Sequence, residues 1–168
     1  MTENRSDTKD DGTMVELPSE REIRITRSFA APARIVFEAM SNPEYVRKWW
    51  APQSRGEMTV CEIDFRVGGA WRYVMRAHSG FEVGFSGKFL EISAPVRVVQ
   101  TEIFDPFPDL GSVVTAELVE RAGITTLTSR VVYPSKEVRD QVLATGMEDG
   151  MRESYRQLTD VISNLARG

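Results

Sequence analysis

The chain has 168 residues, of which 41% are hydrophobic, 27% charged and 9% aromatic, a composition typical of one globular domain. No apolar run approaches the roughly 20 residues that a membrane-spanning helix needs, so we expect no membrane partner. Residues 1–20 contain six of the 25 acidic and two of the 21 basic residues, which leaves 19 of each in the remainder. A neutral body without a basic block argues against nucleic acid as a partner.

Residues 1–20 are acidic and contain few apolar side chains, so we predict a disordered tail that precedes a single domain of residues 21–168. The tail has neither the apolar core of a signal peptide nor the Arg-rich character of a transit peptide. The single cysteine, Cys61, cannot form an intramolecular disulfide, which agrees with a reducing compartment. We therefore expect a cytoplasmic protein.

The first elements are a strand and two short helices. Apolar residues and Arg27 alternate with polar ones over residues 22–29, which predicts a strand. Residues 31–40 change to helical spacing. Ser41 or Asn42 then caps a second short helix that begins at Pro43 and stops at Pro52.

The middle of the chain predicts only strands, separated by short turns. Their ranges are residues 58–65, 70–77, 81–92, 96–104, 112–120 and 124–133. With the first strand this makes about seven, and short connections imply that neighbours are mostly antiparallel.

The last segment has helical periodicity from residue 135 to residue 165, which predicts one helix of roughly eight turns. Gly146 and Gly150 share a stripe with Ser154, so we expect a strand or a ligand to approach closely there. The element order predicts an α+β fold in which a curved antiparallel sheet of about seven strands wraps around the long helix. The two short helices would close one end, and the concave side would be difficult to fill completely.

Three segments carry a resemblance to a known family. They are "ITRSFAAPARIVFEAMSNPEYVRKWWAP" (25–52), "FRVGGAWRYVM" (65–75) and "GMEDGMRESYRQLTDVI" (146–162). In this order they resemble the bacterial homologues of the activator of the heat-shock-protein-90 ATPase, a family of the START-like (SRPBCC) superfamily. The resemblance covers about residues 23–165 and implies a helix-grip domain with an elongated internal cavity.

The resemblance also implies a function, the binding of a hydrophobic or amphipathic small molecule in the cavity. Some members of the superfamily are polyketide cyclases, and others protect a producing organism by binding its antibiotic. The family name comes from a eukaryotic co-chaperone that has an extra N-terminal domain. Residues 1–20 of this chain are too few to form such a domain. Binding of a lipid-like, polyketide-like or antibiotic molecule without catalysis is therefore our first expectation. A cyclase or aromatase and a protein-interaction module are the alternatives.

Candidate ligand-binding residues are those that the pattern places on inward faces or at the ends of the barrel. Aromatic rings and flexible thioethers suit an apolar cavity of irregular shape, although ordinary core packing gives the same pattern. A cavity of several hundred cubic ångströms would favour a small-molecule function. The candidates are Arg27, Trp49, Trp50, Trp71, Tyr73, Met75, Phe85, Phe104, Met147, Met151 and Tyr155.

Three of these candidates have a specific rationale. We expect one indole of the adjacent pair Trp49 and Trp50 to lie in the cavity wall and the other to pack beneath the following loop. Two exposed indoles would leave a large hydrophobic patch on the surface. Arg27 is the charged member of an apolar strand face, so it needs a partner such as Glu102 or Glu117. It is either a cation for an acidic ligand or a strand-end arginine that reaches solvent.

No motif indicates catalysis or a cofactor. We predict no catalytic residue and no metal, since one histidine, His78, and one cysteine cannot supply a zinc site without several carboxylates. Inward acid and base candidates are limited to Arg27, Tyr73, Glu102, Glu117 and Tyr155. The oligomeric state stays open between a monomer and a homodimer, because an unpaired strand edge makes pairing conceivable.

Overall fold

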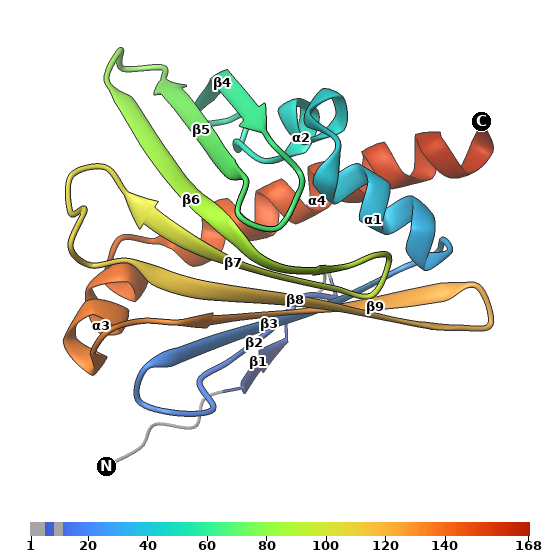
Figure 1. Ribbon diagram of the computed structural model, residues 1–168, viewed down its shortest axis with the longest axis horizontal. Helices are drawn as coiled ribbons and strands as arrows, with labels where there is room; N and C mark the ends of the chain where they lie inside the picture. The colour runs from blue at the N-terminus through green and yellow to red at the C-terminus, as the bar shows by residue number, and fades with distance from the viewer. Residues whose placement is uncertain (1–5, 9–11) are drawn as a thin grey trace.

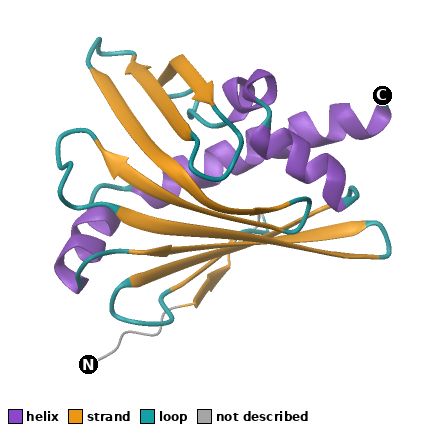
Figure 2. Ribbon diagram, in the orientation of Figure 1, coloured by secondary structure: helices purple, strands orange, loops and turns teal. Residues whose placement is uncertain are grey.

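The computed structural model describes residues 6–8 and 12–168. The described chain forms one antiparallel sheet of nine strands in the order β1-β2-β3-β9-β8-β7-β6-β5-β4, with α4 running across it and α1 and α2 beside one end (Figure 1, Figure 2). The strands are β1 (Ser6–Thr8), β2 (Met14–Glu16), β3 (Glu22–Phe29), β4 (Gly56–Ile63), β5 (Ala70–Ala77), β6 (Glu82–Ser93), β7 (Arg97–Phe104), β8 (Ser112–Arg121) and β9 (Ile124–Val132). The helices are α1 (Ala33–Ser41), α2 (Pro43–Trp49), α3 (Lys136–Ala144) and α4 (Met147–Arg167).

This architecture confirms the α+β helix-grip prediction and its seven strands, which correspond to β3–β9. The two additional strands lie in the segment that the sequence predicts as a disordered tail. Val15 and Leu17 are fully or almost fully buried in the core, and β2 pairs with β3. Arg152 also donates a hydrogen bond to the carbonyl of Thr13, with an Nη1–O distance of 2.8 Å. Two buried apolar residues therefore fix part of this acidic segment; residues 1–5 and 9–11 lie outside the described part.

The predicted single C-terminal helix is wrong, because α3 and α4 are separate. Gly146 lies between them with φ of +79°, a left-handed conformation that interrupts the helix and that glycine adopts without strain. Gly150, inside α4, has a close neighbour, but this neighbour is the loop after α2 and not the strand or ligand that we expected. A Cβ atom added there would lie 2.9 Å from Nη1 of Arg55 and 3.5 Å from Cγ of Pro52.

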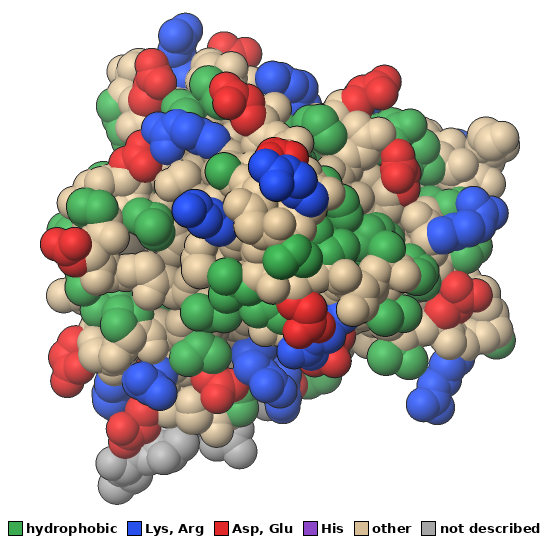
Figure 3. Space-filling view, in the orientation of Figure 1, with side chains coloured by type: hydrophobic (Ala, Val, Ile, Leu, Met, Phe, Trp, Pro, Cys, Tyr) green, Lys and Arg blue, Asp and Glu red, His purple; other side chains and the backbone are tan. Residues whose placement is uncertain are grey.

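Two clusters of buried side chains form the interior. The larger lies between α1, α4 and the β3, β8 and β9 region of the sheet, around fully buried Val36, Leu127 and Leu158. The smaller includes Val46 of α2 and Trp71 of β5. In the space-filling view, hydrophobic side chains gather near the middle of one face, with charges of both signs around them (Figure 3). Within the described residues, no helix is both long and apolar enough to cross a membrane.

Candidate functional site

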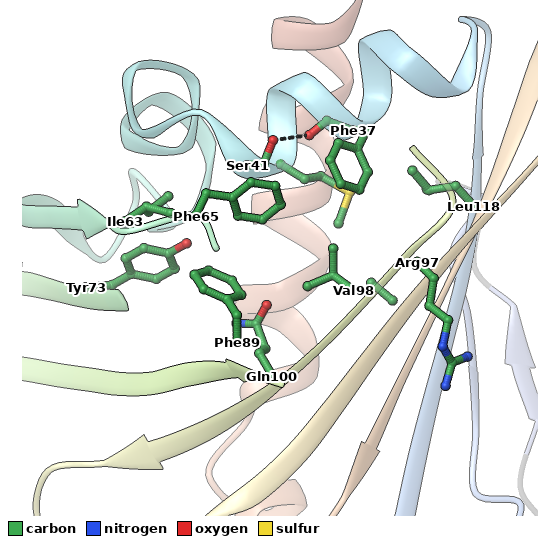
Figure 4. Close-up of a pocket in the computed structure, with 12 residues that line it drawn as sticks. Phe37, Ser41, Ile63, Phe65, Tyr73, Phe89, Arg97, Val98, Gln100 and Leu118 are labelled. Carbon is green, nitrogen blue, oxygen red and sulfur yellow. Dashed lines mark hydrogen bonds between the residues drawn. The ribbon is translucent and has the colours of Figure 1, made fainter. Parts of the chain in front are cut away.

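A cavity of about 50 Å³ lies between α1, the segment that follows β4, and the strands β5–β8. Aromatic and aliphatic side chains form most of its wall (Figure 4). The lining residues are Phe37, Met40, Ser41, Ile63, Phe65, Tyr73, Phe89, Arg97, Val98, Gln100, Ala116 and Leu118. The guanidinium of Arg97 points away from the others (Figure 4) and pairs with Glu91, at 2.8 Å from Nε to Oε2.

Local sequence explains how these walls are placed. The helical spacing of α1 puts Phe37 and Met40 on the side that faces the sheet. The loop 64–69 brings Phe65 against this face, where its ring centroid lies 5.7 Å from that of Phe37 and 5.1 Å from that of Phe89. Both contacts have edge-to-face geometry, which aromatic pairs favour. Three rings from a helix, a loop and a strand thus close one side of the cavity.

The cavity is much smaller than the several hundred cubic ångströms that a drug-sized ligand occupies. One water needs roughly 10–15 Å³ by a comparable measure, so about 50 Å³ holds a few waters or part of a ring. The rings of Phe37, Phe65 and Phe89 fill space that the sequence-based expectation left open. A larger ligand requires movement of α1, which lies outside the sheet, because main-chain hydrogen bonds join the loop 64–69 to β6, with 2.8 Å from the Gly68 amide to the Phe89 carbonyl.

The polar groups of the interior come mainly from β5 and β7. Tyr73 and Gln100 line the cavity, and Glu102 is the next residue of β7 with the same side-chain direction as Gln100. Burial raises the pKa of the Glu102 carboxyl from 4.5 to about 7. Burial also raises the pKa of Tyr73, and the nearby Glu102 and Cys61 add to this effect. The interior therefore carries a carboxyl group that changes its charge near neutral pH.

Five of the predicted ligand-binding residues form one aromatic cluster beside the cavity. Trp50 lies edge-on to Tyr73 at 5.1 Å and to Phe85 at 5.2 Å. Trp71 lies 4.7 Å from Tyr73, and Phe104 lies 5.1 Å from Phe85, all between ring centroids. Tyr73 is the one predicted ligand-binding residue that also lines the cavity.

The other predicted residues lie in or near the larger core. The Trp49 indole is buried and donates to the carbonyl of Ala39 at 2.8 Å, and its ring centroid lies 6.5 Å from that of Tyr155. Burial raises the pKa of Tyr155 to about 12. Met147 and Met151 are partly buried and pack against this core, and Met75 is partly buried on β5. Both indoles of the Trp49–Trp50 pair thus contact the interior, on different sides; a ligand-binding role for these residues stays a prediction.

Arg27 is buried on β3, but its partners differ from the two expected carboxylates. Its guanidinium donates to the hydroxyl of Thr13 at 2.8 Å and to that of Thr159 at 3.0 Å. Glu117 instead pairs with Arg97, at 3.3 Å between Oε2 and Nη1. Among the described residues, Glu102 has no ion pair. Arg27 therefore joins β3 to α4, away from the cavity.

The described residues include no metal-binding cluster and no reactive thiol. No group of three or more His, Cys, Asp or Glu residues is placed to hold a metal ion there. His78 is exposed, and its Nε2 lies 2.9 Å from the carbonyl oxygen of Gln53. Cys61 is buried, and burial raises the pKa of its thiol to about 11, which disfavours the reactive thiolate.

Sequence reasoning missed most of the cavity wall. Phe37 and Met40 belong to an amphipathic helix, whose apolar stripe predicts burial without indicating what it faces. Phe65 was assigned to a strand but lies in a loop. Gln100 is the one cavity residue that the sequence could have indicated as a site residue. It is a polar residue at an inward position of β7, between Val98 and Glu102.

Comparisons with known proteins agree with this fold. Residues 30–163 match the family described as Activator of Hsp90 ATPase homolog 1-like protein. A crystal structure from Rhodobacter sphaeroides is similar, with 27% identity, a TM-score of 0.83, and coverage of 91% of this chain and 99% of that one. Another from Mycobacterium smegmatis has 25% identity, a TM-score of 0.76 and coverage of 94% of both chains. A third, from Chromobacterium violaceum, has 26% identity, a TM-score of 0.74 and coverage of 84% of this chain and 97% of that one. No curated protein matches the chain.

Proposed function

Because the chain belongs to the family of Activator of Hsp90 ATPase homolog 1-like proteins, whose fold is of a small-molecule-binding kind, we propose that it binds a hydrophobic or aromatic small molecule in the cavity beneath α1. The single observation that carries this proposal is the cavity itself, an apolar space with a few polar groups inside a helix-grip domain. Small-molecule sites have this composition, with apolar walls for affinity and polar groups for orientation.

The walls of the cavity suit a ligand that enters by displacing side chains. Met40 is unbranched and polarizable, so it adapts to an irregular neighbour. Phe37 and Phe65 contact each other across the space between α1 and the loop 64–69, and separation of these two rings would enlarge the cavity. The proposed ligand therefore presents a flat ring to Phe37, Phe65 and Phe89.

The experiment uses the seven methionines as local reporters. Protein labelled with ¹³C at the methionine methyl groups is titrated with toluene and observed by NMR. We expect the Met40 signal to shift first, because Met40 lines the cavity. Absence of any Met40 shift up to the solubility limit of toluene would contradict the proposal.

A variant that fills the cavity supplies a matched test. Ala116 lines the cavity from β8, so Ala116→Leu should abolish the Met40 shift by occupying the space. Ala70→Leu makes the same change at an exposed position on β5 and should bind toluene like the wild type. Equal binding by both variants would place the ligand elsewhere.

A second candidate function is proton transfer on a carbonyl compound, as in a polyketide cyclase. The observation that favours it is Glu102, whose carboxyl group has a pKa raised to about 7 by burial near the Tyr73 hydroxyl. In such a step the Glu102 carboxylate takes a proton from the carbon next to the carbonyl. The resulting enolate oxygen accepts a hydrogen bond from Tyr73, and the proton then returns to carbon.

Exchange of the methyl protons of acetophenone in D₂O at pH 8 tests this second candidate. A positioned general base contributes typically 10²–10⁴-fold, so wild-type protein should exceed Glu102→Gln by about that factor. Equal exchange rates would eliminate Glu102 as a base and leave binding as the function.

A further inference from the structure

Three polar side chains on the concave face of the sheet have no side-chain hydrogen-bond partner in the described part of the chain. They are the hydroxyl of Tyr73, the amide of Gln100 and the carboxylate of Glu102. Tyr73 and Gln100 line the cavity, and Glu102 lies about 7 Å further along β7, since alternate residues of a strand face the same side. Figure 4 shows the Tyr73 ring and the Gln100 amide on either side of Phe89.

The absence of partners has a structural consequence. Within the described residues, every side-chain nitrogen or oxygen that is shielded from solvent has a hydrogen-bond partner. These three groups make no side-chain hydrogen bond with the described residues, so their polar atoms must face open space. A polar group that faces open space can bind water or a ligand.

The charge of this region has one sign. Glu102 acts on Tyr73 of β5 and on Tyr133 after β9, and burial raises the pKa of both phenols. Cys61 on β4 acts on Tyr73 in the same direction. Two arginines of the sheet are engaged elsewhere, because Arg27 donates to Thr13 and Arg97 pairs with Glu91. When Glu102 ionises, its charge has no counterion among the described residues.

We propose that the ligand is an aromatic molecule that carries a hydrogen-bond donor, an amine above all or else a phenol. Its ring occupies the apolar cavity, and its donor group binds the Glu102 carboxylate with Gln100 and Tyr73 beside it. Aromatic carboxylates are disfavoured, because they would bring a second negative charge beside Glu102, while Arg97, the cation of the cavity lining, points away and pairs with Glu91. This inference rests on the proposed function and specifies the chemical class of its ligand.

Four single-ring probes with different polar groups test the inference on the full chain. They are toluene, p-cresol, benzylamine and benzoate, and the readout is the Met40 methyl signal at pH 8. We expect benzylamine to bind about tenfold more tightly than toluene, the effect of one hydrogen bond to a charged group. We expect p-cresol to lie between these two and benzoate to bind most weakly.

Substitution at Glu102 separates the carboxylate from the rest of the site. In Glu102→Gln the ratio of benzylamine to toluene affinity should fall to about one. Glu117→Gln removes a carboxylate from the neighbouring strand β8, where Glu117 pairs with Arg97, and should keep the wild-type ratio. Equal ratios in wild type and Glu102→Gln would overturn the inference.

The pH dependence of the wild type gives a second measurement that needs no variant. Benzylamine stays cationic from pH 5 to pH 8, while Glu102 ionises across a pKa of about 7. Tyr73, Tyr133 and Cys61 stay neutral over this range, because burial raises each of their pKa values. Benzylamine affinity should therefore rise about tenfold from pH 5 to pH 8 while toluene affinity stays constant.

The outcomes distinguish this inference from the proposed function. If all four probes shift Met40 equally at both pH values, the function stands and the selection by Glu102 is wrong. If none of the four shifts Met40, the proposed function fails, and this inference fails with it.

Discussion

Gln157 of α4 provides a quantitative test of how the fold holds the two tryptophans in place. Its Nε2 donates to the carbonyls of Trp49 at 3.0 Å and Ala51 at 2.9 Å, and its Oε1 accepts from the amide of Gln53 at 2.9 Å. The last carbonyls of any helix lack intrahelical donors, and α2 ends at Trp49. One side chain from a distant helix thus satisfies three main-chain groups at this helix end.

Replacement by leucine keeps a similar volume and removes all three hydrogen bonds. Each such bond contributes about 0.5–1.5 kcal/mol, and Gln157 is only partly buried, so the lower half of the sum applies. We expect Gln157→Leu to reduce the free energy of unfolding by about 1.5–3 kcal/mol. For a domain of this size, that corresponds to a fall in Tm of about 3–12 °C.

Urea unfolding followed by circular dichroism measures this difference. Asn164→Leu is the matched control, because it makes the same change from amide to leucine at an exposed position of the same helix. Its free energy of unfolding should stay within about 0.5 kcal/mol of the wild-type value. A midpoint for Gln157→Leu that equals that of Asn164→Leu would refute the idea that α4 caps α2.

Three further predictions concern buried polar groups. Arg27→Met removes the hydrogen bonds to Thr13 and Thr159 and should lower the free energy of unfolding by about 1–3 kcal/mol; an unchanged urea midpoint would show that β3 and α4 do not depend on them. The folded state binds the Glu102 proton more tightly than the unfolded chain, because the pKa rises from 4.5 to about 7. The contribution of Glu102 to stability should therefore be present below pH 4.5 and fall by about 3 kcal/mol as the pH rises through 7. Urea unfolding at pH 4 and pH 8 should show this extra fall in the wild type relative to Glu102→Gln, and parallel curves would contradict it. Cys61 is buried with a raised thiol pKa, so Ellman's reagent at pH 8 should react with it only as fast as the chain opens; rapid labelling of the folded protein would be inconsistent with this burial.

Much of the fold could be predicted from local sequence patterns such as strand alternation and helix capping. Alternation over residues 22–29 predicts β3, and Asn42 followed by Pro43 predicts the start of α2, where the Asn42 side chain accepts from the amide of Glu44 at 3.0 Å. Both signals depend on neighbours in the chain, so they need no knowledge of the fold. The break at Gly146 was missed because glycine is also tolerated inside a helix at modest cost.

The candidate site was less predictable. Sequence periodicity placed Tyr73 and Glu102 on inward faces correctly, but Glu117, which we also expected inside, is exposed and pairs with Arg97. Periodicity could not tell that Phe37 of α1, Phe65 of a loop and Phe89 of β6 meet around one cavity, because these residues come from segments that only tertiary packing brings together.

The sequence by itself predicted the core strands β3–β9, the two short helices and the family, since these follow from local periodicity and from motifs within single segments; it missed β2 and the break at Gly146. Only the tertiary structure decided which inward residues pack tightly and which enclose space. It also decided that Arg27 has hydroxyl partners while Glu102 has no counterion among the residues that the structure describes. The physical reason is that partners and cavities depend on distances between side chains remote in sequence, and a periodic pattern contains no such distances.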